Sequence, residues 1–342
     1  MTKWLDGIAI DEDVVISTRV RVARNISKYR FPSYMTVTES DDLTDDILNG
    51  MKEVMDDNYK FVRIRDITPR EQMVYIEDHL ISPNLADRKD KSSFLLRNDE
   101  RATVMINEED HIRIQTLFPG FNLNDAWKLC SDIDDKLSEK LEYAFDDRWG
   151  YLTACPTNVG TGLRASVMLH LPCITFAKTI NSLIEGLREI GLTVRGLYGE
   201  GSESLGYLYQ ISNQVTLGES EEDIIGKLNK VVYQIIQRER KTREYLKEKK
   251  GMELENRIYR SYGILSYARI MSSKEAITHL SNLRLGWEMG LFSNEEIKDI
   301  FNLMVEVQPA NIQKEFNKDM DNEERDIARA KKIRDYIYNL EG

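Results

Sequence analysis

"VVISTRVRVARN", residues 14–25, places Arg19, Arg21 and Arg24 close together on the chain. Small apolar residues stand between them: Val20, Val22 and Ala23. This alternation predicts a β-strand with the arginines on one face and the apolar residues on the other. Guanidinium groups on one face repel each other, so either solvent surrounds them on an exposed strand or the face binds an anion. Polyphosphate is a suitable anion, because the fork of an arginine side chain matches phosphate oxygens.

The composition is that of a soluble globular protein. The 342 residues are 41% hydrophobic and 31% charged, enough for one large domain or two ordinary ones. A net charge of -11 argues against a protein that coats nucleic acid and against a basic protein of the membrane surface. No apolar run approaches the ~20 residues of a membrane span. Three cysteines without metal-ligand spacing, and an acidic N-terminus unlike a signal peptide, predict a cytoplasmic protein.

Strand and helix patterns are mixed up to about residue 250. Two strands are expected at 104–106 and 112–114, around a polar centre. A helix is expected over 124–145 with Asn124 as its N-cap, because apolar residues recur every three or four positions. These residues are Cys130, Ile133, Leu137, Leu141 and Ala144. Another helix is expected from an N-cap at Ser220. Its apolar stripe is Ile224, Leu228, Val231, Ile235 and Ile236.

A change of pattern divides the chain. Residues 241–257 are nearly all polar, which is typical of a solvated helix or a linker. From Ser261 onward the strand patterns stop, and helices are expected over 267–285, 294–307 and 322–340. The change from mixed to all-helical predicts two domains, residues 1–250 and residues 251–342.

Two further segments concentrate polar groups that stability alone does not require. "NEEDHIRI", residues 107–114, is either a polar hairpin turn or a place where a carboxylate acts as a general base beside Arg113. "CPTNVGTGLRAS", residues 155–166, is a tight loop whose backbone amides can line an anion site next to Arg164. Cys155 is either a small apolar residue at the start of this loop or a reactive thiol.

A glycine-rich segment, "VRGLYGEG" at residues 194–201, contains Arg195 and Glu200. It predicts either a loop that closes over a ligand or a plain long hairpin. Arginines thus come from four segments, together with carboxylates, while the Walker pattern GxxxxGK[ST] is absent. The combination predicts a site for a nucleoside triphosphate, where catalysis depends on positioning and charge stabilisation with Mg²⁺ bridging phosphate oxygens.

The same four segments resemble motifs of the ATP:guanidino phosphotransferases, the family of creatine and arginine kinases. "STRVRVARN", "NEEDHIRI", "CPTNVGTGLR" and "VRGLYGEG" occur in the family's order and at compatible spacing, over about residues 10–245. The resemblance implies an α+β catalytic domain, in which helices pack on an antiparallel sheet. It also implies ATP as the phosphoryl donor, and Mg²⁺ held by the nucleotide phosphates.

The motif match implies roles for individual residues. The phosphates of ATP would be bound by Ser17, Arg19, Arg21, Arg113, Arg164 and Arg195. His79, in "IEDHL", resembles the family's histidine near the adenine. Glu109 matches the catalytic glutamate, and Glu200 matches a second carboxylate on the glycine-rich loop. Cys155 matches the cysteine beside the guanidino substrate.

One departure from the family narrows the resemblance. Enzymes that act on small guanidino compounds have a helical domain before the arginine strand, with a loop that closes on the substrate. Here the strand pattern begins at Val14, and an extra helical region follows the catalytic motifs instead. This arrangement looks like the bacterial branch of the family that phosphorylates arginine residues in proteins. An open acceptor site for an arginine on a polypeptide is then expected.

The segment "RDIARA", residues 325–330, resembles the motif with which that branch binds phosphoarginine as an allosteric signal. The residues concerned are Arg325, Asp326, Arg329 and Ala330. The alternative is a plain amphipathic helix, with Asp326 paired to Arg325 or Arg329. Its buried residues would be Ile327, Ala330, Ile333 and Ile337.

The resemblance further implies a place in stress response and protein quality control. The implied substrates are a heat-shock repressor and unfolded proteins. The other implied partners are a zinc-finger activator protein, a AAA+ unfoldase–protease and a second copy of this chain, bound through the C-terminal helices. No direct binding to nucleic acid or membrane is expected.

Two other functions stay open from the sequence. One is a kinase for a free guanidino compound, against which the missing leading domain argues. The other is a binding module, a phosphoarginine reader or adaptor with an inactive site. The presence of Glu109, Glu200 and Cys155 together with the arginines argues against that alternative.

Overall fold

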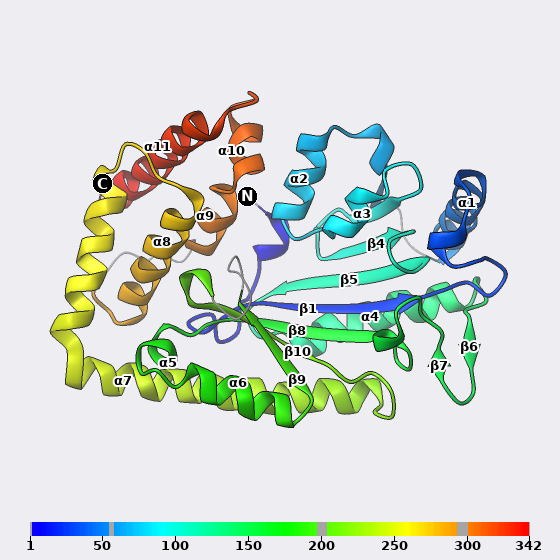
Figure 1. The fold of residues 1–342 in the computed structure, drawn as a ribbon, viewed down its shortest axis with the longest axis horizontal. Coiled ribbons are helices and arrows are strands. Elements are labelled where there is room, and N and C mark those ends of the chain that lie inside the picture. Colours follow the sequence, from blue (N-terminus) through cyan, green and yellow to red (C-terminus); the bar gives the residue numbers. More distant parts are fainter. Residues whose placement is uncertain (1, 55–57, 197–203, 293–299, 342) are drawn as a thin grey trace.

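The computed structural model describes residues 2–54, 58–196, 204–292 and 300–341. Within these residues, eight strands form one antiparallel sheet in the order β2-β3-β4-β5-β1-β8-β10-β9 (Figure 1). The strands are β1 Val15–Arg24, β2 Tyr59–Arg63, β3 Ser93–Arg97, β4 Ala102–Ile106, β5 Ile112–Pro119, β8 Leu163–His170, β9 Leu192–Gly196 and β10 Leu208–Asn213. A separate hairpin pairs β6, Phe145–Asp146, with β7, Gly150–Tyr151. The α+β expectation is confirmed, and the arginine strand β1 lies between β5 and β8.

One face of the sheet carries the main apolar core. Val20 and Val22 of β1 are fully buried on it, among residues of β5, β8 and β10. Two helices cover this face: α4, Leu123–Ser138, packs on β1 and β5, and α7, Glu221–Tyr267, packs on β8 and β10. The opposite face carries the polar side chains of β1, beside a second apolar core that includes Met105, Leu117 and Met168.

Arg24 lies on the apolar face, so the expectation that all three arginines share a face is wrong. Side chains alternate with a period of two along a strand, and position 24 differs in parity from 19 and 21. The guanidinium is 1% exposed and is satisfied by Asp134 of α4, at 2.6 and 3.0 Å, and by two backbone carbonyls. It also stacks on the ring of Tyr151, 3.5 Å from the centroid. Arg24 is therefore a structural residue.

Helix α4 is shorter than the predicted 124–145. It begins after Asn122, not at Asn124, and ends at Ser138. The chain then turns, because the backbone N–H groups of Lys140 and Leu141 both bond back to Leu137. Leu141 is still buried against the core, but Ala144 has left the helix, and its N–H donates to the carbonyl of Asn25 at 2.7 Å.

Helix α7 begins as predicted. Ser220 is its N-cap, and the Ser220 hydroxyl accepts from the N–H of Asp223 at 3.1 Å. The polar segment 241–257 belongs to this helix, which confirms the solvated-helix alternative over the linker. The backbone of Lys250 departs from helical geometry (φ -137°, ψ 23°), and the helix bends there (Figure 1).

After α7 the described chain is helical, as expected. The helices are α8 Ser273–Glu288, α9 Ile300–Glu306, α10 Pro309–Glu315 and α11 Asn322–Glu341. The expected start at Tyr267 is wrong, because Tyr267 still ends α7 and Ser272 caps α8. Residues 294–299 of the expected second helix lie outside the described residues. The short helix α10 was not expected, and it begins at Pro309, a favourable first helical residue.

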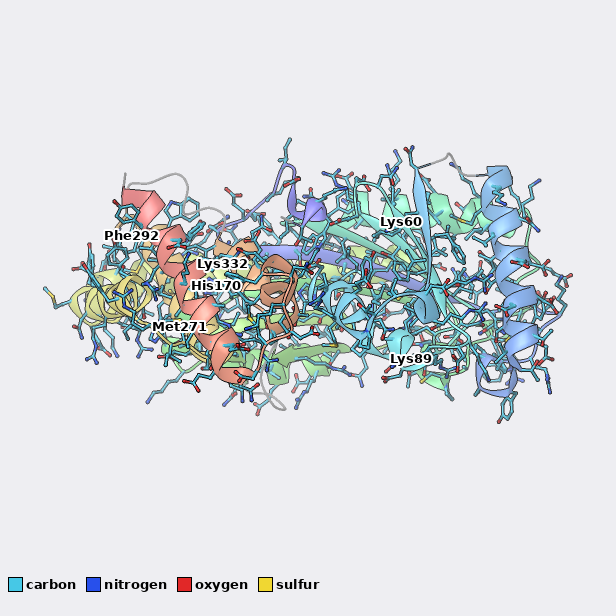
Figure 2. All side chains as sticks on the ribbon, turned by 90° about the horizontal axis from the view of Figure 1, so that it is seen from above. Lys60, Lys89, His170, Met271, Phe292 and Lys332 are labelled. Carbon is cyan, nitrogen blue, oxygen red and sulfur yellow. The ribbon has the colours of Figure 1, made fainter. Side chains whose placement is uncertain are left out.

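The remaining helices are α1 Val37–Val54, α2 Pro69–Glu77, α3 Pro83–Asp87, α5 Pro172–Phe176 and α6 Ile180–Glu189. Of these, α1, α5 and α6 pack on the main core, and α2 and α3 pack on the other side of the sheet. Figure 2 shows α1 and the C-terminal helices at opposite ends of the molecule. A second core, which includes Trp4, Phe94 and Met105, joins the sheet to the C-terminal helices. In the part of the chain that is described, no helix is long and apolar enough to cross a membrane.

Candidate active site

Six predicted phosphate-binding residues share the polar face of the sheet. Residues paired across antiparallel strands project to the same side. Arg21 of β1 is paired with Arg164 of β8, and Arg19 of β1 with Ser166 of β8. The remaining register places Ser17, Arg113 and Arg195 on the same face. The sheet thus brings five arginines from four strands together.

The arginines repel each other in surroundings that disfavour charge. Burial, with the charges of Arg164 and Arg113, lowers the pKa of Arg19 to about 10. Burial, and then the charge of Arg19, holds the pKa of Arg21 well below its usual value. Burial and Arg195 likewise lower the pKa of Arg164. The face therefore carries positive charge that the surrounding protein only partly compensates.

Buried donors on this face lack acceptors. The Nε atoms of Arg19, Arg21 and Arg164 are buried without a hydrogen-bond partner. Leaving such a donor unsatisfied costs about 1–3 kcal/mol. An anion with several oxygens would satisfy these donors and offset the repulsion, so the residues present fit the triphosphate of a nucleotide.

Arg113 is held by two consecutive glutamates. Its Nη1 donates to Glu108 at 2.5 Å, and its Nη2 lies 3.3 Å from Glu109. Glu108 is fully buried and also accepts from the Ser82 hydroxyl at 2.5 Å. Glu108 therefore orients Arg113, a role that the sequence did not distinguish from that of Glu109. Glu109 is the more exposed carboxylate, with 38% of its side chain accessible.

A cavity of about 250 Å³ lies where these groups meet. Its lining includes Arg21, Asn84, Glu109, Arg113, Cys155, Thr157 and Arg164. The Cys155 sulfur lies 3.0 Å from the Thr157 hydroxyl, at the start of a short 3-10 turn. Glu109 and Cys155, far apart in sequence, thus line the same space as three of the arginines.

Buried polar groups brace the loop that carries Cys155. The fully buried Asp110 accepts from the Asn25 amide at 2.7 Å and from the backbone N–H of Ala154 at 2.6 Å. The ring of His111 bonds through both nitrogens to backbone groups just after β1, an N–H and a carbonyl. A neutral imidazole satisfies both bonds, and burial lowers the pKa of His111 accordingly. The last two residues of "NEEDH" are therefore structural.

His79 lies beside the other end of the arginine row. It follows α2 with a left-handed backbone (φ 62°). With Ser17, Arg19 and Trp4 it lines a small cavity of about 40 Å³. Burial, and the charge of Arg19, lower the pKa of His79 to about 4, so the imidazole is neutral near pH 7. A neutral ring at this place suits contact with a nucleobase rather than with a phosphate.

The glycine-rich segment is described only in part. Arg195 ends up exposed on β9, opposite Gln210 of β10. Glu200, the expected second carboxylate, lies outside the described residues.

The C-terminal motif "RDIARA" lies in α11, away from the arginine face (Figure 1). Arg329 is 1% exposed, and its guanidinium donates to the carbonyls of Val307 and Met271 at 2.8 and 2.9 Å and pairs with Asp326. Arg329 thus joins α11 to the ends of α9 and of the segment before α8. Ala330, Ile333 and Ile337 are buried as expected.

Two features of this motif differ from, or add to, the expectation. Ile327 is 46% exposed, so the expected burial of that residue is wrong. Arg325 is partly exposed, and it donates to the carbonyl of Met320 at 3.2 Å and to the side chain of Asn322. Arg325 is the more accessible of the two arginines.

An antiparallel sheet with a row of arginines on one face, and a glutamate and a cysteine at the end of that row, defines a guanidino-type phosphotransferase. Comparison with family models agrees. The model described as ATP:guanido phosphotransferase, C-terminal catalytic domain matches residues 42–242, and that described as Protein-arginine kinase McsB C-terminal domain matches residues 251–342.

Curated relatives place the chain more narrowly. A protein-arginine kinase of Brevibacillus brevis is 46% identical over 99% of this chain and 96% of its own length. One from Halalkalibacterium halodurans is 46% identical over 98% of this chain and 94% of its own length. The chain belongs to the protein-arginine kinase family, and it is a kinase.

Solved structures of similar fold include a lombricine kinase and a taurocyamine kinase. A lombricine kinase has a TM-score of 0.60 and 27% identity, over 70% of each chain. The duplicated taurocyamine kinase of Schistosoma mansoni has a TM-score of 0.63 and 27% identity, over 72% of this chain and 36% of its own. The likeness to these two kinases confirms the predicted fold class.

Proposed function

We propose that this protein transfers the γ-phosphoryl group of ATP to the guanidino group of arginine residues in proteins. The observation that carries the proposal is the row of arginines on one sheet face, with buried and unpartnered Nε donors, that ends at a cavity with a glutamate and a cysteine. Relatives of nearly full length that bear the name protein-arginine kinase support the choice of acceptor.

The nucleotide would lie along the arginine row. Its base would be near His79, and its phosphates would lie along Ser17 and the arginines. The terminal phosphate would be near Arg21, Arg113 and Arg164. Among the described residues, no three His, Cys, Asp or Glu side chains gather as a metal-binding group. Mg²⁺ would be held by the phosphate oxygens of the nucleotide, as in other phosphoryl transfers from ATP, and would add its charge to that of the arginines.

The acceptor arginine would enter the 250 Å³ cavity beside Glu109 and Cys155. A guanidinium is a poor nucleophile while protonated. Glu109, with Glu200 as the second carboxylate, would hold it through paired hydrogen bonds and accept one proton from it. The freed nitrogen then forms a bond to the γ-phosphorus while the bond from that phosphorus to the bridging oxygen breaks, and ADP leaves with the electron pair. Cys155 would orient the guanidino group.

The test of this activity compares acceptors. With ATP labelled on the γ-phosphate, we expect acid-labile label on a disordered protein such as casein and little on free arginine. Glu109→Gln should lose more than 100-fold in transfer rate, the range of a lost general base, and keep its affinity for ATP. Label mainly on free arginine would make the protein a small-molecule kinase, and full activity of E109Q would refute the role of Glu109. If neither acceptor is labelled, the result favours the adaptor alternative, whether or not the protein binds ATP.

We also propose that the chain works as two parts, residues 1–250 for catalysis and residues 251–342 for dimerisation and regulation. In the second part, Arg325, Asp326, Arg329 and Ala330 would form a receptor for phosphoarginine. The partial exposure of Arg325 supports a ligand contact there, while the buried Arg329 would position Asp326. Such a receptor would raise activity as modified proteins accumulate.

Arg325→Ala tests the receptor. We expect it to abolish activation by added phosphoarginine and to leave basal transfer within twofold. Lys331→Ala on the same helix, where an exposed lysine pairs with Asp335 at 2.6 Å, is the matched control and should be activated normally. Activation of R325A equal to that of the unaltered protein would remove the receptor role.

The resemblance to protein-arginine kinases supports a wider setting in stress response and protein quality control. The proposed substrates are a heat-shock repressor and unfolded proteins, and the proposed partners are a zinc-finger activator and a AAA+ unfoldase–protease. We place the protein in the cytoplasm. Cys130, Cys155 and Cys173 are all free thiols, in keeping with a reducing compartment.

A further inference from the structure

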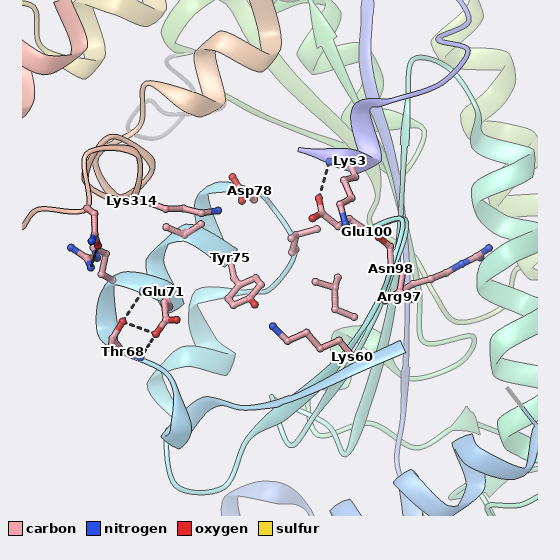
Figure 3. A pocket seen from close by; sticks show the side chains of 15 residues that line it. Lys3, Lys60, Thr68, Glu71, Tyr75, Asp78, Arg97, Asn98, Glu100 and Lys314 are labelled. Atoms are coloured by element: carbon pink, nitrogen blue, oxygen red, sulfur yellow. Dashed lines mark hydrogen bonds between the residues drawn. The ribbon is translucent and has the colours of Figure 1, made fainter. Parts of the chain in front are cut away.

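A second, larger cavity lies outside the arginine row. It measures about 580 Å³ and lies among α2, strands β2 and β3, the turn after β3, the N-terminal segment and the end of α10 (Figure 3). This volume is in the range of sites that hold small organic molecules. It shares no lining residue with the cavities at His79 and at Cys155. Nothing in the proposed transfer reaction uses it.

The acidic groups around this cavity already have partners. The carboxylate of Glu71 accepts from the backbone N–H and the hydroxyl of Thr68, both at 2.8 Å. Glu100 accepts from the backbone N–H of Lys3 at 2.8 Å. Asp78 accepts from the side-chain amide of Asn311 at 3.0 Å. All three carboxylates are held by neutral donors, and burial raises the pKa of Asp78 and of Glu100, so their surroundings disfavour the charged form.

The cationic groups are more numerous and two of them lack a partner. The lining contains Lys3, Lys60, Arg70, Arg97 and Lys314. Arg70 and Arg97 pair with the exposed Asp319 and with Asp99. Lys60 and Lys314 form no ion pair with any described residue, although the charge of Lys60 acts on Glu71 and that of Lys314 on Asp78 and Glu100. The two lysines reach toward the cavity from opposite walls (Figure 3). Two ammonium groups that face one space attract an anion.

One wall of the cavity is apolar. It contains Val74, Tyr75, Leu80 and Leu96. The Tyr75 ring is fixed by an edge-to-face contact with Phe94, with centroids 5.0 Å apart. A fixed aromatic ring and aliphatic neighbours suit a flat or apolar body rather than a bare inorganic ion.

We propose that this cavity is a binding site for an organic phosphate, a molecule with an aromatic or apolar body that carries a phosphate monoester. Lys60 and Lys314 hold the phosphate between them. Tyr75, Val74 and Leu96 receive the body. Because Lys314 belongs to α10 and Lys60 to β2, the bound molecule joins the C-terminal helices to the sheet.

The site is next to the nucleotide site but separate from it. Lys3 and Asp78 line this cavity, whereas their chain neighbours Trp4 and His79 line the small cavity at Arg19. The wall between the cavities is closed by a hydrogen bond from the Trp4 indole to the carbonyl of Asp78, at 3.0 Å. A nucleotide analogue can therefore fill one site and leave the other free.

The experiment measures binding of phenyl phosphate to the full chain by titration calorimetry. The arginine row is first saturated with the magnesium complex of AMP-PNP, an ATP analogue that occupies the γ-phosphate position. We expect one molecule of phenyl phosphate per chain. Its affinity should fall at least tenfold in the Lys60→Met, Lys314→Met double variant. The double variant Lys89→Met, Lys249→Met removes two exposed lysines elsewhere and should bind as the unaltered protein does.

Two results would overturn the proposal: no binding to the unaltered protein, or equal binding by the K60M/K314M variant. Should that variant fail to fold, the salt dependence of the unaltered protein decides instead. Contact between a dianion and two ammonium groups predicts an affinity that falls several-fold between low and moderate salt. Affinity independent of salt would contradict it. Neither readout requires phosphoryl transfer, so the outcome is independent of the proposed function.

Discussion

Arg21 and Arg24 stand three positions apart on β1 and have opposite surroundings. Arg24 meets a carboxylate, two carbonyls and an aromatic ring, so its charge is compensated inside the core. Arg21 meets three other arginines, and its Nε has no acceptor. Arg24 therefore stabilises the fold. Arg21 carries a free-energy cost that only a ligand offsets.

We expect Arg21→Met to abolish phosphoryl transfer without lowering the free energy of unfolding, because the substitution removes repulsion and an unsatisfied donor. Arg24→Met is the matched control on the same strand. It leaves the buried Asp134 without its cation and should cost about 3–5 kcal/mol. Urea unfolding and the transfer assay measure both. A large loss of stability in R21M would contradict the assignment.

For single residues, the sequence predicts some placements correctly and others wrongly. The alternation on β1 correctly predicts that Arg19 and Arg21 share a face. Arg24 was expected on the same face, but it stands at an even position and therefore points to the opposite one. Glu108 and Glu109 are adjacent and chemically identical, so only the fold decides which one is buried against Arg113. Ile327 fits the helical period, three positions before the buried Ala330, yet it is exposed, so the period alone does not fix where the buried stripe of α11 begins.

At the scale of elements, a carboxylate at the end of α2 contacts the start of α10. Glu77, at the end of α2, accepts from the backbone N–H groups of Ala310 and Asn311, at 2.8–3.0 Å, where α10 begins. Burial nevertheless raises the pKa of Glu77 to about 7, since it outweighs the effect of these bonds. The carboxyl group therefore keeps its proton in the folded state over a range in which it loses it in the unfolded chain.

Stability should consequently fall as the pH rises from about 4.5 to 7, because the unfolded chain ionises first and the folded state binds more protons. In Glu77→Gln this contribution is absent. We expect the free energy of unfolding of the variant to rise relative to that of the unaltered protein as the pH increases from 5 to 8. Urea unfolding measures this difference. Glu288, whose pKa burial also raises to about 7, is present in both proteins, so the difference isolates Glu77. A pH-independent difference would refute the raised pKa.

Elements were easier to predict than their ends. The strands at residues 104–106 and 112–114, and the N-cap at Ser220, follow from local pattern and are confirmed. The end of α4 does not follow from it, because Ala144 is drawn away by a strand far earlier in the chain. Helix α10 has too few residues for a period to be visible, and it begins where its backbone N–H groups bond to Glu77.

For the whole molecule, a contact at Gly206 joins the sheet to the C-terminal helices. Gly206 has a left-handed backbone (φ 64°), and an added Cβ would lie 2.8 Å from a methyl group of Ile277 in α8. The carbonyl of Gly206 accepts from the Ser281 hydroxyl at 2.7 Å, and His170 of β8 bonds to the same hydroxyl at 2.7 Å. Ser281 of α8 thus connects the end of β8 to the turn before β10.

We expect Gly206→Ala to lower the free energy of unfolding by more than about 2 kcal/mol, from the left-handed backbone and the clash together. Gly226→Ala is the control, since Gly226 lies in α7 with nothing within 4 Å of an added Cβ. It should be neutral or gain up to about 1 kcal/mol. Equal changes in the free energy of unfolding for the two variants would contradict a tight contact between Gly206 and α8.

The bend of α7 at Lys250 decides whether the C-terminal helices can be exchanged between related proteins as a separate unit. The corner is packed on a small core of its own: Cys173, Leu246, Leu254, Ile258, Leu285 and Met289. The amine of Lys247 also donates to the carbonyl of Met289 at 3.0 Å. A chimaera spliced at residue 250 would cut this core in half and expose Leu246 on one side and Leu254 on the other. An exchange between relatives must therefore transplant α5, the whole of α7 and α8 as one piece.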